Sequence, residues 1–326
     1  MNWYLPLFNI KETSLRIIPM IYTITLAPVL ERTLDVEEFI YDDVNHVISE
    51  NRKAGGKGID VSRVIKELGG YSVALGFVGG YNGREVEGRV VSEGIVCNFT
   101  PTSGETRMDI VVNQRKKTMQ TLLSAPMSPV NPIETTAFYS RIKDIPPESY
   151  VVMVGSIPEG LAQAFWAQLI AVLREKRVRI VLDADNEPLK QGVEAGPFLI
   201  KPNIHELSRL VGKNVREIEE IIEETEPLLE RVEYVVVSLG ARGALGLSKK
   251  ERIHAVPPKV NVRSSLGAGD ALIGGLVLAL DGGADFREAL GLGVSCGTAS
   301  TLTSGYASCF RGDIDEIRKQ VLMKNI

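Results

Sequence analysis

Short apolar segments alternate with amphipathic segments along the chain from residue 20 onward. Apolar segments of strand length lie at residues 21–27, 72–78, 151–154, 178–183, 198–201 and 234–238. Segments with apolar residues at helical spacing lie at residues 59–68, 160–176, 204–211, 215–231, 270–281 and 286–303. Continuous apolar strands are typical of a sheet covered on both faces. The alternation therefore predicts a parallel α/β sheet with helices on both sides.

Two segments, residues 32–52 and 98–123, interrupt this alternation. In the second, residues 106–113 and 118–123 predict a β-hairpin. Both segments follow a core strand or its helix, so we expect them to form a small β-rich lid over the sheet edge. The α/β core is then made of residues 20–31, 53–97 and 124–326.

Residues 1–19 lack the charged start and apolar stretch of a signal peptide, and we interpret them as an N-terminal extension. No later apolar run reaches the roughly 18 residues that a membrane-spanning helix needs. The chain has 37 basic and 41 acidic side chains, so its net charge of -4 gives no support for a nucleic-acid or membrane partner.

Several kinds of chemistry are excluded by the remaining motifs. The three cysteines, Cys97, Cys296 and Cys309, are too few and too dispersed for a disulfide framework or a thiolate metal site, which favours a cytoplasmic location. Residues 293–297 match Gly-x-Ser-x-Gly, but they lie in a helical stretch with no later histidine, so a hydrolase triad is excluded. No pair of histidines has the spacing of a zinc site.

The 31 glycines exceed the usual share of roughly 7%, and two glycine-rich loops precede predicted helices. The first is Ala-Gly-Gly-Lys-Gly-Ile-Asp at residues 54–60, and the second is Ser-Ser-Leu-Gly-Ala-Gly-Asp at residues 264–270. Glycines let backbone amides approach an anion at the positive end of a helix, and Lys57 adds a full charge. Asp270 alone could serve only as a helix-dipole partner. Two such loops together predict a phosphoryl-transfer site, which needs amide donors, a base and a nucleotide clamp.

These residues resemble the ribokinase-like (PfkB) sugar kinases, and within them the phosphosugar branch of phosphofructokinases and tagatose-6-phosphate kinase. The resemblance extends from residue 20 to about residue 321. It rests on ordered blocks: Thr-Leu-Ala-Pro (25–28), Gly-Gly-Lys-Gly-Ile (55–59), Gly-Ser-Ile-Pro (155–158), Lys-Pro-Asn-Ile-His-Glu-Leu (201–207), Ser-Leu-Gly-Ala-Arg-Gly-Ala (238–244) and Gly-Ala-Gly-Asp (267–270). It implies a three-layer α/β/α sandwich with a mostly parallel central sheet and a small β-sheet lid.

The resemblance implies a role for each matching residue on the catalytic and nucleotide side. Asp270 matches the catalytic base, and the amides of Gly267, Ala268 and Gly269 match the anion hole. Asn203 matches a contact to the nucleotide phosphates, and Glu206 matches a residue that organises Mg²⁺ through water. Asn203 also fits a helix N-cap, and both roles can hold together. The other matching nucleotide contacts are Lys201, Ser238, Gly240, Gly243, Val294 and Thr298.

On the acceptor side, Arg107 matches a lid arginine that holds the acceptor's own phosphate, with Gly56, Lys57 and Ser156 close by. Arginine suits bidentate recognition of such oxygens. The alternative for Arg107 is a solvated strand residue.

Two residues depart from the family pattern at positions that touch sugar hydroxyls. Glu31 stands where relatives have Asp, and Asp60 stands where they have Asn. An ionised carboxylate only accepts hydrogen bonds, whereas an amide also donates. Two carboxylates would then face one sugar, unless one is paired with a cation such as Lys57. A phosphopentose such as ribose 1-phosphate is therefore an alternative acceptor.

The function implied is an ATP- and Mg²⁺-dependent kinase that phosphorylates a hydroxymethyl of fructose 1-phosphate, fructose 6-phosphate or tagatose 6-phosphate. ADP as the donor, a nucleoside or free-sugar kinase, and a weakly catalytic sugar-phosphate-binding regulator are the alternatives. The resemblance also implies a homodimer formed through the lid. It further implies a K⁺ site at backbone oxygens near Ser264, Leu266, Ser300 and Gly305.

Overall fold

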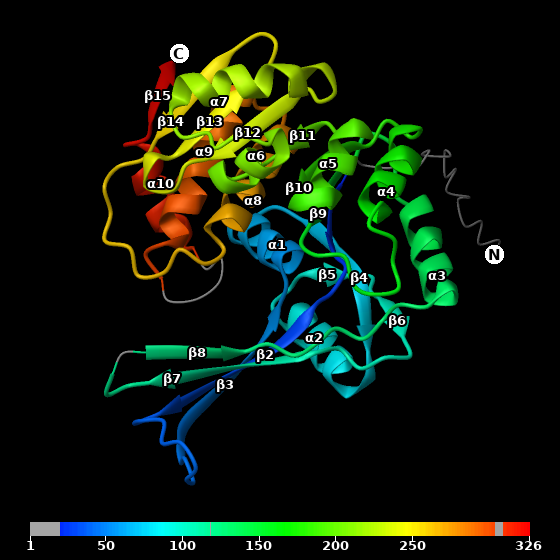
Figure 1. Ribbon diagram of the computed structural model, residues 1–326, viewed down its shortest axis with the longest axis vertical. Coiled ribbons are helices and arrows are strands. Elements are labelled where there is room, and N and C mark those ends of the chain that lie inside the picture. Colours follow the sequence, from blue (N-terminus) through cyan, green and yellow to red (C-terminus); the bar gives the residue numbers. More distant parts are fainter. Residues whose placement is uncertain (1–19, 118, 304–308) are drawn as a thin grey trace, which may run out of the picture.

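The computed structural model describes residues 20–117, 119–303 and 309–326, so residues 1–19 and Gly305 lie outside the described residues (Figure 1). An 11-stranded sheet forms its centre. In spatial order its strands are β15 (Leu322–Asn325), β14 (Arg252–Val256), β13 (Ala244–Leu247), β12 (Tyr234–Ser238), β11 (Leu199–Ile200), β10 (Arg179–Asp183), β9 (Tyr150–Val154), β1 (Ile21–Thr25), β4 (Ser72–Gly79) and β5 (Val96–Cys97), with β6 (Thr100–Thr102) also paired to β4.

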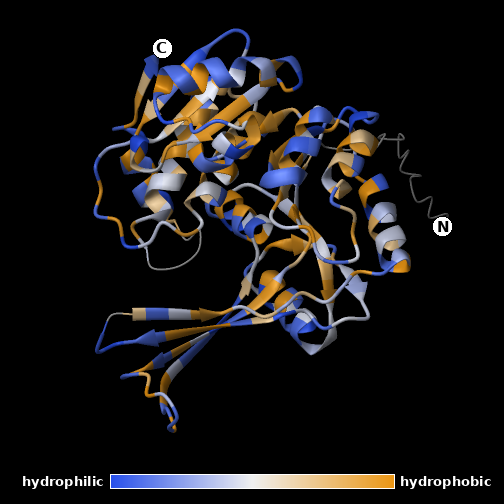
Figure 2. Cartoon of the chain, in the orientation of Figure 1, coloured by the Kyte–Doolittle hydropathy of each residue, from blue (hydrophilic) through white to orange (hydrophobic). Residues whose placement is uncertain are grey.

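Strands β12 to β5 of this sheet run parallel, and β13, β14 and β15 add an antiparallel edge. Figure 2 shows that apolar residues concentrate in the central strands. Successive side chains of a strand point to opposite faces. Val151 and Met153 accordingly join one apolar cluster, and Val152 and Val154 join another.

Helices cover both faces of the sheet, as the burial pattern of the strands requires. One layer contains α3 (Pro132–Lys143), α4 (Phe165–Arg174), α5 (Asn186–Glu194), α6 (Ile204–Val211) and α7 (Ile218–Thr225), followed by the 3-10 helix η1 (Glu226–Glu230). The other layer contains α1 (Lys57–Glu67), α8 (Ala268–Asp281) and α9 (Phe286–Ser300), with α10 (Arg311–Arg318) packed on α9. None of the described helices is long and apolar enough to cross a membrane.

A second, four-stranded sheet extends away from this core (Figure 1). Its spatial order is β3 (Val47–Gly55), β2 (Val29–Val36), β7 (Met108–Gln114) and β8 (Met119–Leu123). At its root, Leu30, Ala54 and Met108 pack with α2 (Gly80–Ser92) in an apolar cluster. Their strand neighbours Glu31 and Lys53 therefore lie on the opposite face.

The elements expected from the apolar pattern are present, but several differ in extent. The helix expected at residues 215–231 is divided into α7 and η1. The four-stranded sheet begins at Val29 and extends to Gly55, beyond the expected residues 32–52, because the chain enters and leaves it without a break in pairing. Residues 100–102, expected in the lid, form β6 and pair with β4 of the large sheet.

Candidate active site

Several residues that the sequence singled out lie at or directly after the ends of neighbouring strands of the large sheet. Because the carboxyl ends of parallel strands meet at one edge, this edge is where a ligand site is expected. β10 ends at Asp183, Lys201 directly follows β11, and Ser238 ends β12. Ser156 is exposed in the loop after β9, where Gly155 N donates to Asp183 O at 3.2 Å.

Asp270 lies in the first turn of α8, and its side chain is buried. Gly267 caps this helix in a left-handed conformation with φ of 76°, which glycine adopts without strain. Burial and the charges of Asp183 and Asp60 raise the pKa of Asp270 well above the usual aspartate range. A carboxyl with a raised pKa is a stronger base once ionised, as proton abstraction from a hydroxyl requires.

The start of α8 also supplies donors for an anion. The first amides of a helix have no acceptor within it, and here Ala268 N lies 3.4 Å from Ser265 O, at the long end for a hydrogen bond. A Cβ atom built on Gly269 would lie 3.4 Å from Lys201 Nζ, so this ammonium borders the same amides. Gly267, Ala268, Gly269 and Lys201 thus form one positively polarised surface beside the base.

Asp183, which the sequence analysis did not identify as a site residue, forms ion pairs with Lys201 and Lys57. Asp183 Oδ1 lies 3.1 Å from Lys201 Nζ, and Asp183 Oδ2 lies 3.9 Å from Lys57 Nζ. Asp183 and Lys201 are both about 95% buried, with 4% and 5% of the side chains exposed. The charge of Asp183 raises the pKa of Lys57. The signal that could have identified Asp183 is its place as a charged residue ending an apolar strand.

The glycine loop before α1 packs directly on β1. Cβ atoms built on Gly56 and Gly58 would lie 2.6 Å from Thr25 Cγ2 and 2.7 Å from Thr25 Oγ1. Gly56 also has φ of 136°, which other residues rarely adopt. These glycines are therefore required by packing as well as by access of a ligand to the backbone.

Asn203 and Glu206 form a reciprocal cap at the start of α6. Asn203 Oδ1 accepts from His205 N and Glu206 N, and Glu206 Oε2 accepts from Asn203 N at 2.7 Å. The expected capping role of Asn203 is confirmed. Burial, together with Asp183, raises the pKa of Glu206. Asn203 also bridges to Ser238 across the strand ends, which joins two of the expected nucleotide contacts.

The remaining expected nucleotide residues lie beyond β12. Gly240 begins the 3-10 helix η2 (Gly240–Arg242), and Gly243 follows it with φ of 88° and no room for a side chain, since a Cβ would lie 2.0 Å from Ala255 O. On α9, Thr298 Oγ1 donates to Val294 O. The Val294 side chain is buried in the core with α8.

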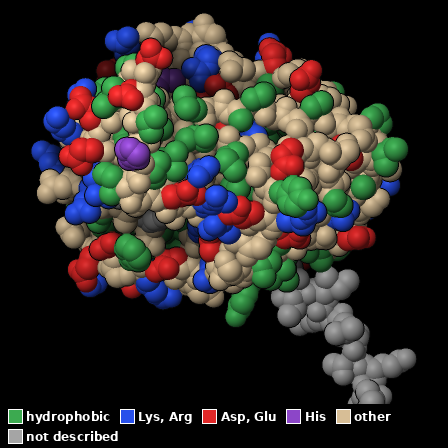
Figure 3. All heavy atoms as spheres, turned by 90° about the horizontal axis from the view of Figure 1, so that it is seen from below, with side chains coloured by type: hydrophobic (Ala, Val, Ile, Leu, Met, Phe, Trp, Pro, Cys, Tyr) green, Lys and Arg blue, Asp and Glu red, His purple; other side chains and the backbone are tan. Residues whose placement is uncertain are grey.

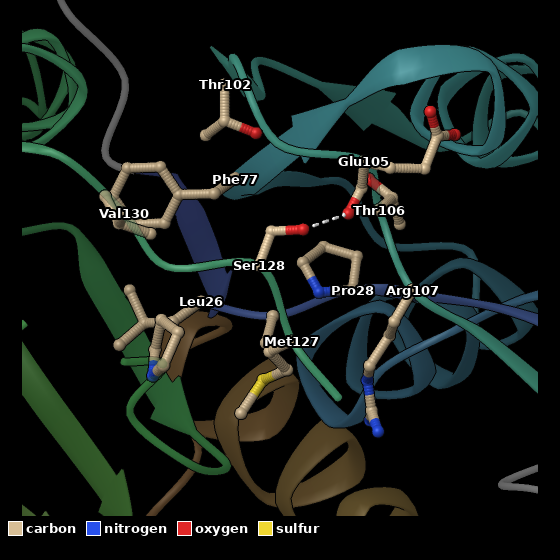
Figure 4. A pocket seen from close by; sticks show the side chains of 12 residues that line it. Leu26, Pro28, Phe77, Thr102, Glu105, Thr106, Arg107, Met127, Ser128 and Val130 are labelled. Atoms are coloured by element: carbon tan, nitrogen blue, oxygen red, sulfur yellow. Dashed lines mark hydrogen bonds between the residues drawn. The ribbon is translucent and has the colours of Figure 1, made fainter. Parts of the chain in front are cut away.

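Arg107 precedes β7 at the root of the four-stranded sheet, and 23% of its side chain is exposed, so it lies outside the strand and is neither fully solvated nor fully buried. Its Nη1 donates to Ser124 Oγ at 3.0 Å and lies 3.3 Å from Asp109 Oδ2. Its Nε is buried and has no hydrogen-bond partner among the described residues. Arg107 lines a small depression together with Pro28 and Met127 (Figure 4), and Ser128 Oγ there donates to Glu105 O.

Lys53, and not Lys57, is the lysine near both carboxylates that depart from the family pattern. Asp60 Oδ1 lies 2.6 Å from Arg63 Nη1 and 3.7 Å from Lys53 Nζ, whereas Lys57 faces Asp183. Burial raises the pKa of Asp60, and burial with the charges of Asp60 and Asp109 raises the pKa of Glu31. The sequence interpretation missed Lys53 and Arg63 because their proximity depends on how β3 crosses α1.

The expected K⁺ site is described in part. Leu266 N donates to Ser264 Oγ, and Arg263 N and Ser264 N donate to Thr301 O, which holds this loop against the end of α9 near Ser300. Gly305 belongs to the part of the chain that is not described.

Comparisons with known proteins agree with this geometry. Residues 23–311 match the pfkB family of carbohydrate kinases. The 1-phosphofructokinase of Borreliella burgdorferi is 33% identical over 94% of this chain and 99% of its own length. The tagatose-6-phosphate kinase of Staphylococcus epidermidis is 29% identical over 93% of this chain and 98% of its own. Phosphofructokinase-2 from Escherichia coli, solved in complex with potassium, has a TM-score of 0.88 at 29% identity, covering 93% of this chain and 99% of its own.

The chain belongs to the pfkB family of carbohydrate kinases. It is therefore a phosphotransferase that uses an alcohol group as the acceptor. The family and the ribokinase-like α/β fold expected from the sequence are confirmed.

Proposed function

We propose that this protein transfers the γ-phosphate of ATP to a hydroxymethyl group of a phosphorylated furanose and so produces a bisphosphate. The observation that carries the proposal is Arg107. Its Nη1 is held by Asp109 and Ser124, and its buried Nε has no partner among the described residues. A buried donor without a partner costs free energy, which an acceptor phosphate bound there would recover.

The acceptor class follows from the relatives as well as from Arg107. A 1-phosphofructokinase and a tagatose-6-phosphate kinase each cover almost the whole chain. Fructose 1-phosphate, fructose 6-phosphate and tagatose 6-phosphate are accordingly the acceptors that we propose. A phosphopentose, a free sugar, a nucleoside and a purely regulatory role are not favoured.

In this proposal, Asp270 and the amides at the start of α8 have different roles in the reaction. Asp270 accepts the proton of the acceptor hydroxymethyl, whose oxygen forms a bond to the γ-phosphorus while the bond from that phosphorus to the β–γ bridging oxygen breaks. The amides of Gly267, Ala268 and Gly269 and the ammonium of Lys201 stabilise the charge on the transferred group. Asn203, Ser238, Gly240, Gly243, Val294 and Thr298 are the proposed nucleotide contacts.

Magnesium fits the carboxylate of Glu206. No group of three or more histidine, cysteine, aspartate or glutamate side chains among the described residues could hold a metal ion. Glu206 is half-buried and uses Oε2 to cap Asn203, which leaves Oε1 for a water of a hydrated ion. When bound there, Mg²⁺ would supply positive charge that offsets the charge of the nucleotide phosphates. We propose a K⁺ ion at the backbone oxygens near Ser264, Leu266, Ser300 and Gly305.

The four-stranded sheet acts as the lid in this proposal, with Glu31, Gly56, Lys57, Asp60, Arg107 and Ser156 around the acceptor. Its edge strands expose apolar side chains, namely Val47, Ile48, Met119, Leu122 and Leu123. Exposed apolar edges favour pairing with a second chain, so we propose a homodimer through the lid. Both charge signs are interspersed on the face seen in Figure 3, which agrees with small-molecule partners.

The cysteines are consistent with a cytoplasmic enzyme. Cys97, Cys296 and Cys309 are all free. Free cysteines persist in a reducing compartment, where nucleotides are also available. We therefore propose that the protein acts in the cytoplasm.

The experiment that tests this function is an assay of the purified protein with Mg²⁺ across a panel of phosphorylated and unphosphorylated ketoses and pentoses. ATP and ADP are compared as donors, and products are identified by phosphorus NMR. We expect a bisphosphate from a ketohexose phosphate with ATP. Turnover confined to unphosphorylated acceptors would contradict the proposal.

A further inference from the structure

A row of charged side chains crosses the root of the lid sheet on the face opposite the apolar cluster. Glu31 of β2 is paired in register with Lys53 of β3 on one side and with Asp109 of β7 on the other. Side chains at paired positions lie on the same face of a sheet. Leu30, Ala54 and Met108, one residue away in each strand, pack in the apolar cluster on the other face.

This row lies between the two ends of the proposed acceptor site. At one end, Asp109 holds Arg107, the proposed phosphate ligand. At the other end, Lys53 Nζ is 3.7 Å from Asp60 Oδ1, and the charge of Asp60 contributes to the raised pKa of Asp270. The row thus connects Arg107 with the neighbourhood of Asp270.

Asp60 and Lys53 differ in how much of each side chain is already bound and buried within the protein. Arg63 donates to Asp60 Oδ1 at 2.6 Å, to Ala54 O at 2.6 Å and to Glu93 Oε2 at 2.6 Å, so it fixes Asp60 between β3 and α2. The Asp60 side chain is 4% exposed, whereas the Lys53 side chain is 23% exposed. Lys53 is thus the more accessible of the two side chains, and Asp60 is almost fully buried.

We propose that Lys53 is a specificity-determining residue whose ammonium donates a hydrogen bond to a ring hydroxyl of the acceptor, beside the accepting carboxylate of Glu31. The inference rests on the proposed function, since it takes the acceptor to extend from Arg107 to Asp270. Ionised Glu31 can only accept hydrogen bonds, and the Lys53 ammonium can only donate them. Together they can bind the hydroxyl hydrogens and the oxygen lone pairs of the sugar. Asp60 is then a positioning residue that holds the ammonium in place.

The test compares Lys53→Met with Lys66→Met, a matched change of an exposed lysine at the end of α1. Steady-state constants are measured for the acceptor and for ATP, together with the melting temperature. We expect Lys53→Met to raise the acceptor KM about 10- to 100-fold, the range for loss of a hydrogen bond from a charged donor. The KM for ATP should stay within about 2-fold of the wild-type value, because the substitution removes a contact to the acceptor and none to the nucleotide. Lys66→Met should resemble the wild type.

An unchanged acceptor KM in folded Lys53→Met would overturn the inference, and so would a parallel rise of both KM values with a lower melting temperature. If Lys53→Met does not fold, Lys53→Arg gives the same comparison with the charge retained, since a guanidinium alters the donor geometry. The acceptor is the sugar that the wild type turns over fastest. Wild-type activity on free sugars alone would contradict the proposed function, whereas the Lys53 comparison can still be made.

Discussion

Asp270 is the residue on which the catalytic account depends, and its burial has a cost for stability. Replacing it by Asn keeps the shape but removes the base, so we expect kcat to fall about 10²- to 10⁴-fold. A variant that retains full function in the cell and full turnover in the assay would favour the regulatory alternative. The KM for ATP should change little, because Asp270 is not among the proposed nucleotide contacts.

The same substitution should stabilise the folded chain, and the sign follows from the raised pKa of Asp270. Between the ordinary aspartate pKa and the raised value, the unfolded chain has lost the proton while the folded chain retains it, so stability falls as pH rises through this window. Asp270→Asn avoids this loss and should melt at a higher temperature at neutral pH. The difference should disappear in acid, below the ordinary aspartate pKa. Equal melting temperatures at neutral pH would contradict the assignment.

Turnover should show the matching pH dependence. Because a base must be ionised, kcat/KM should rise with pH through the raised pKa of Asp270, at a higher pH than an ordinary aspartate would give.

At the scale of elements, the contact between α1 and β1 positions the glycine loop. A Cβ on Gly58 would meet Thr25 Oγ1 at 2.7 Å and the Ile24 carbonyl carbon at 3.0 Å. We expect Gly58→Ala to lower the free energy of unfolding by about 1–3 kcal/mol through overpacking. The control is Gly88→Ala on the exposed face of α2, where nothing lies within 4 Å of the added Cβ and alanine should stabilise by about 0.5–1 kcal/mol. Chemical denaturation measures both, and equal effects would contradict the packing role.

The apolar pattern could predict the central strands because both of their faces are buried. Such strands are apolar throughout, so the local sequence alone reveals them. It could not predict α2, α3 or α5, whose apolar residues are diluted by polar ones. The candidate site could be predicted where its residues belong to a motif at a strand end or a helix start, as Asp270 does. Lys53, Arg63 and Asp183 were missed because their roles arise from tertiary pairing, which local sequence does not specify.

At the scale of the whole molecule, the four-stranded lid sheet is the proposed interface of the homodimer. Leu122 is about half exposed on the edge strand β8. We expect Leu122→Glu to shift the protein from dimer to monomer in light scattering coupled to size exclusion, because a charge there opposes apolar pairing. Val91→Glu on the exposed face of α2 is the matched control and should leave the dimer intact. A wild-type monomer at micromolar concentration would contradict a dimer formed through the lid.

The central claim is that the site accepts a sugar that already carries a phosphate. The most direct measurement is the ratio of kcat/KM for fructose 1-phosphate to that for fructose, in the wild type and in Arg107→Ala. The account predicts a ratio well above about 10² in the wild type, reduced about 10- to 100-fold in Arg107→Ala by loss of charged hydrogen bonds to the phosphate. A wild-type ratio near one, or a ratio that Arg107→Ala leaves unchanged, would contradict it.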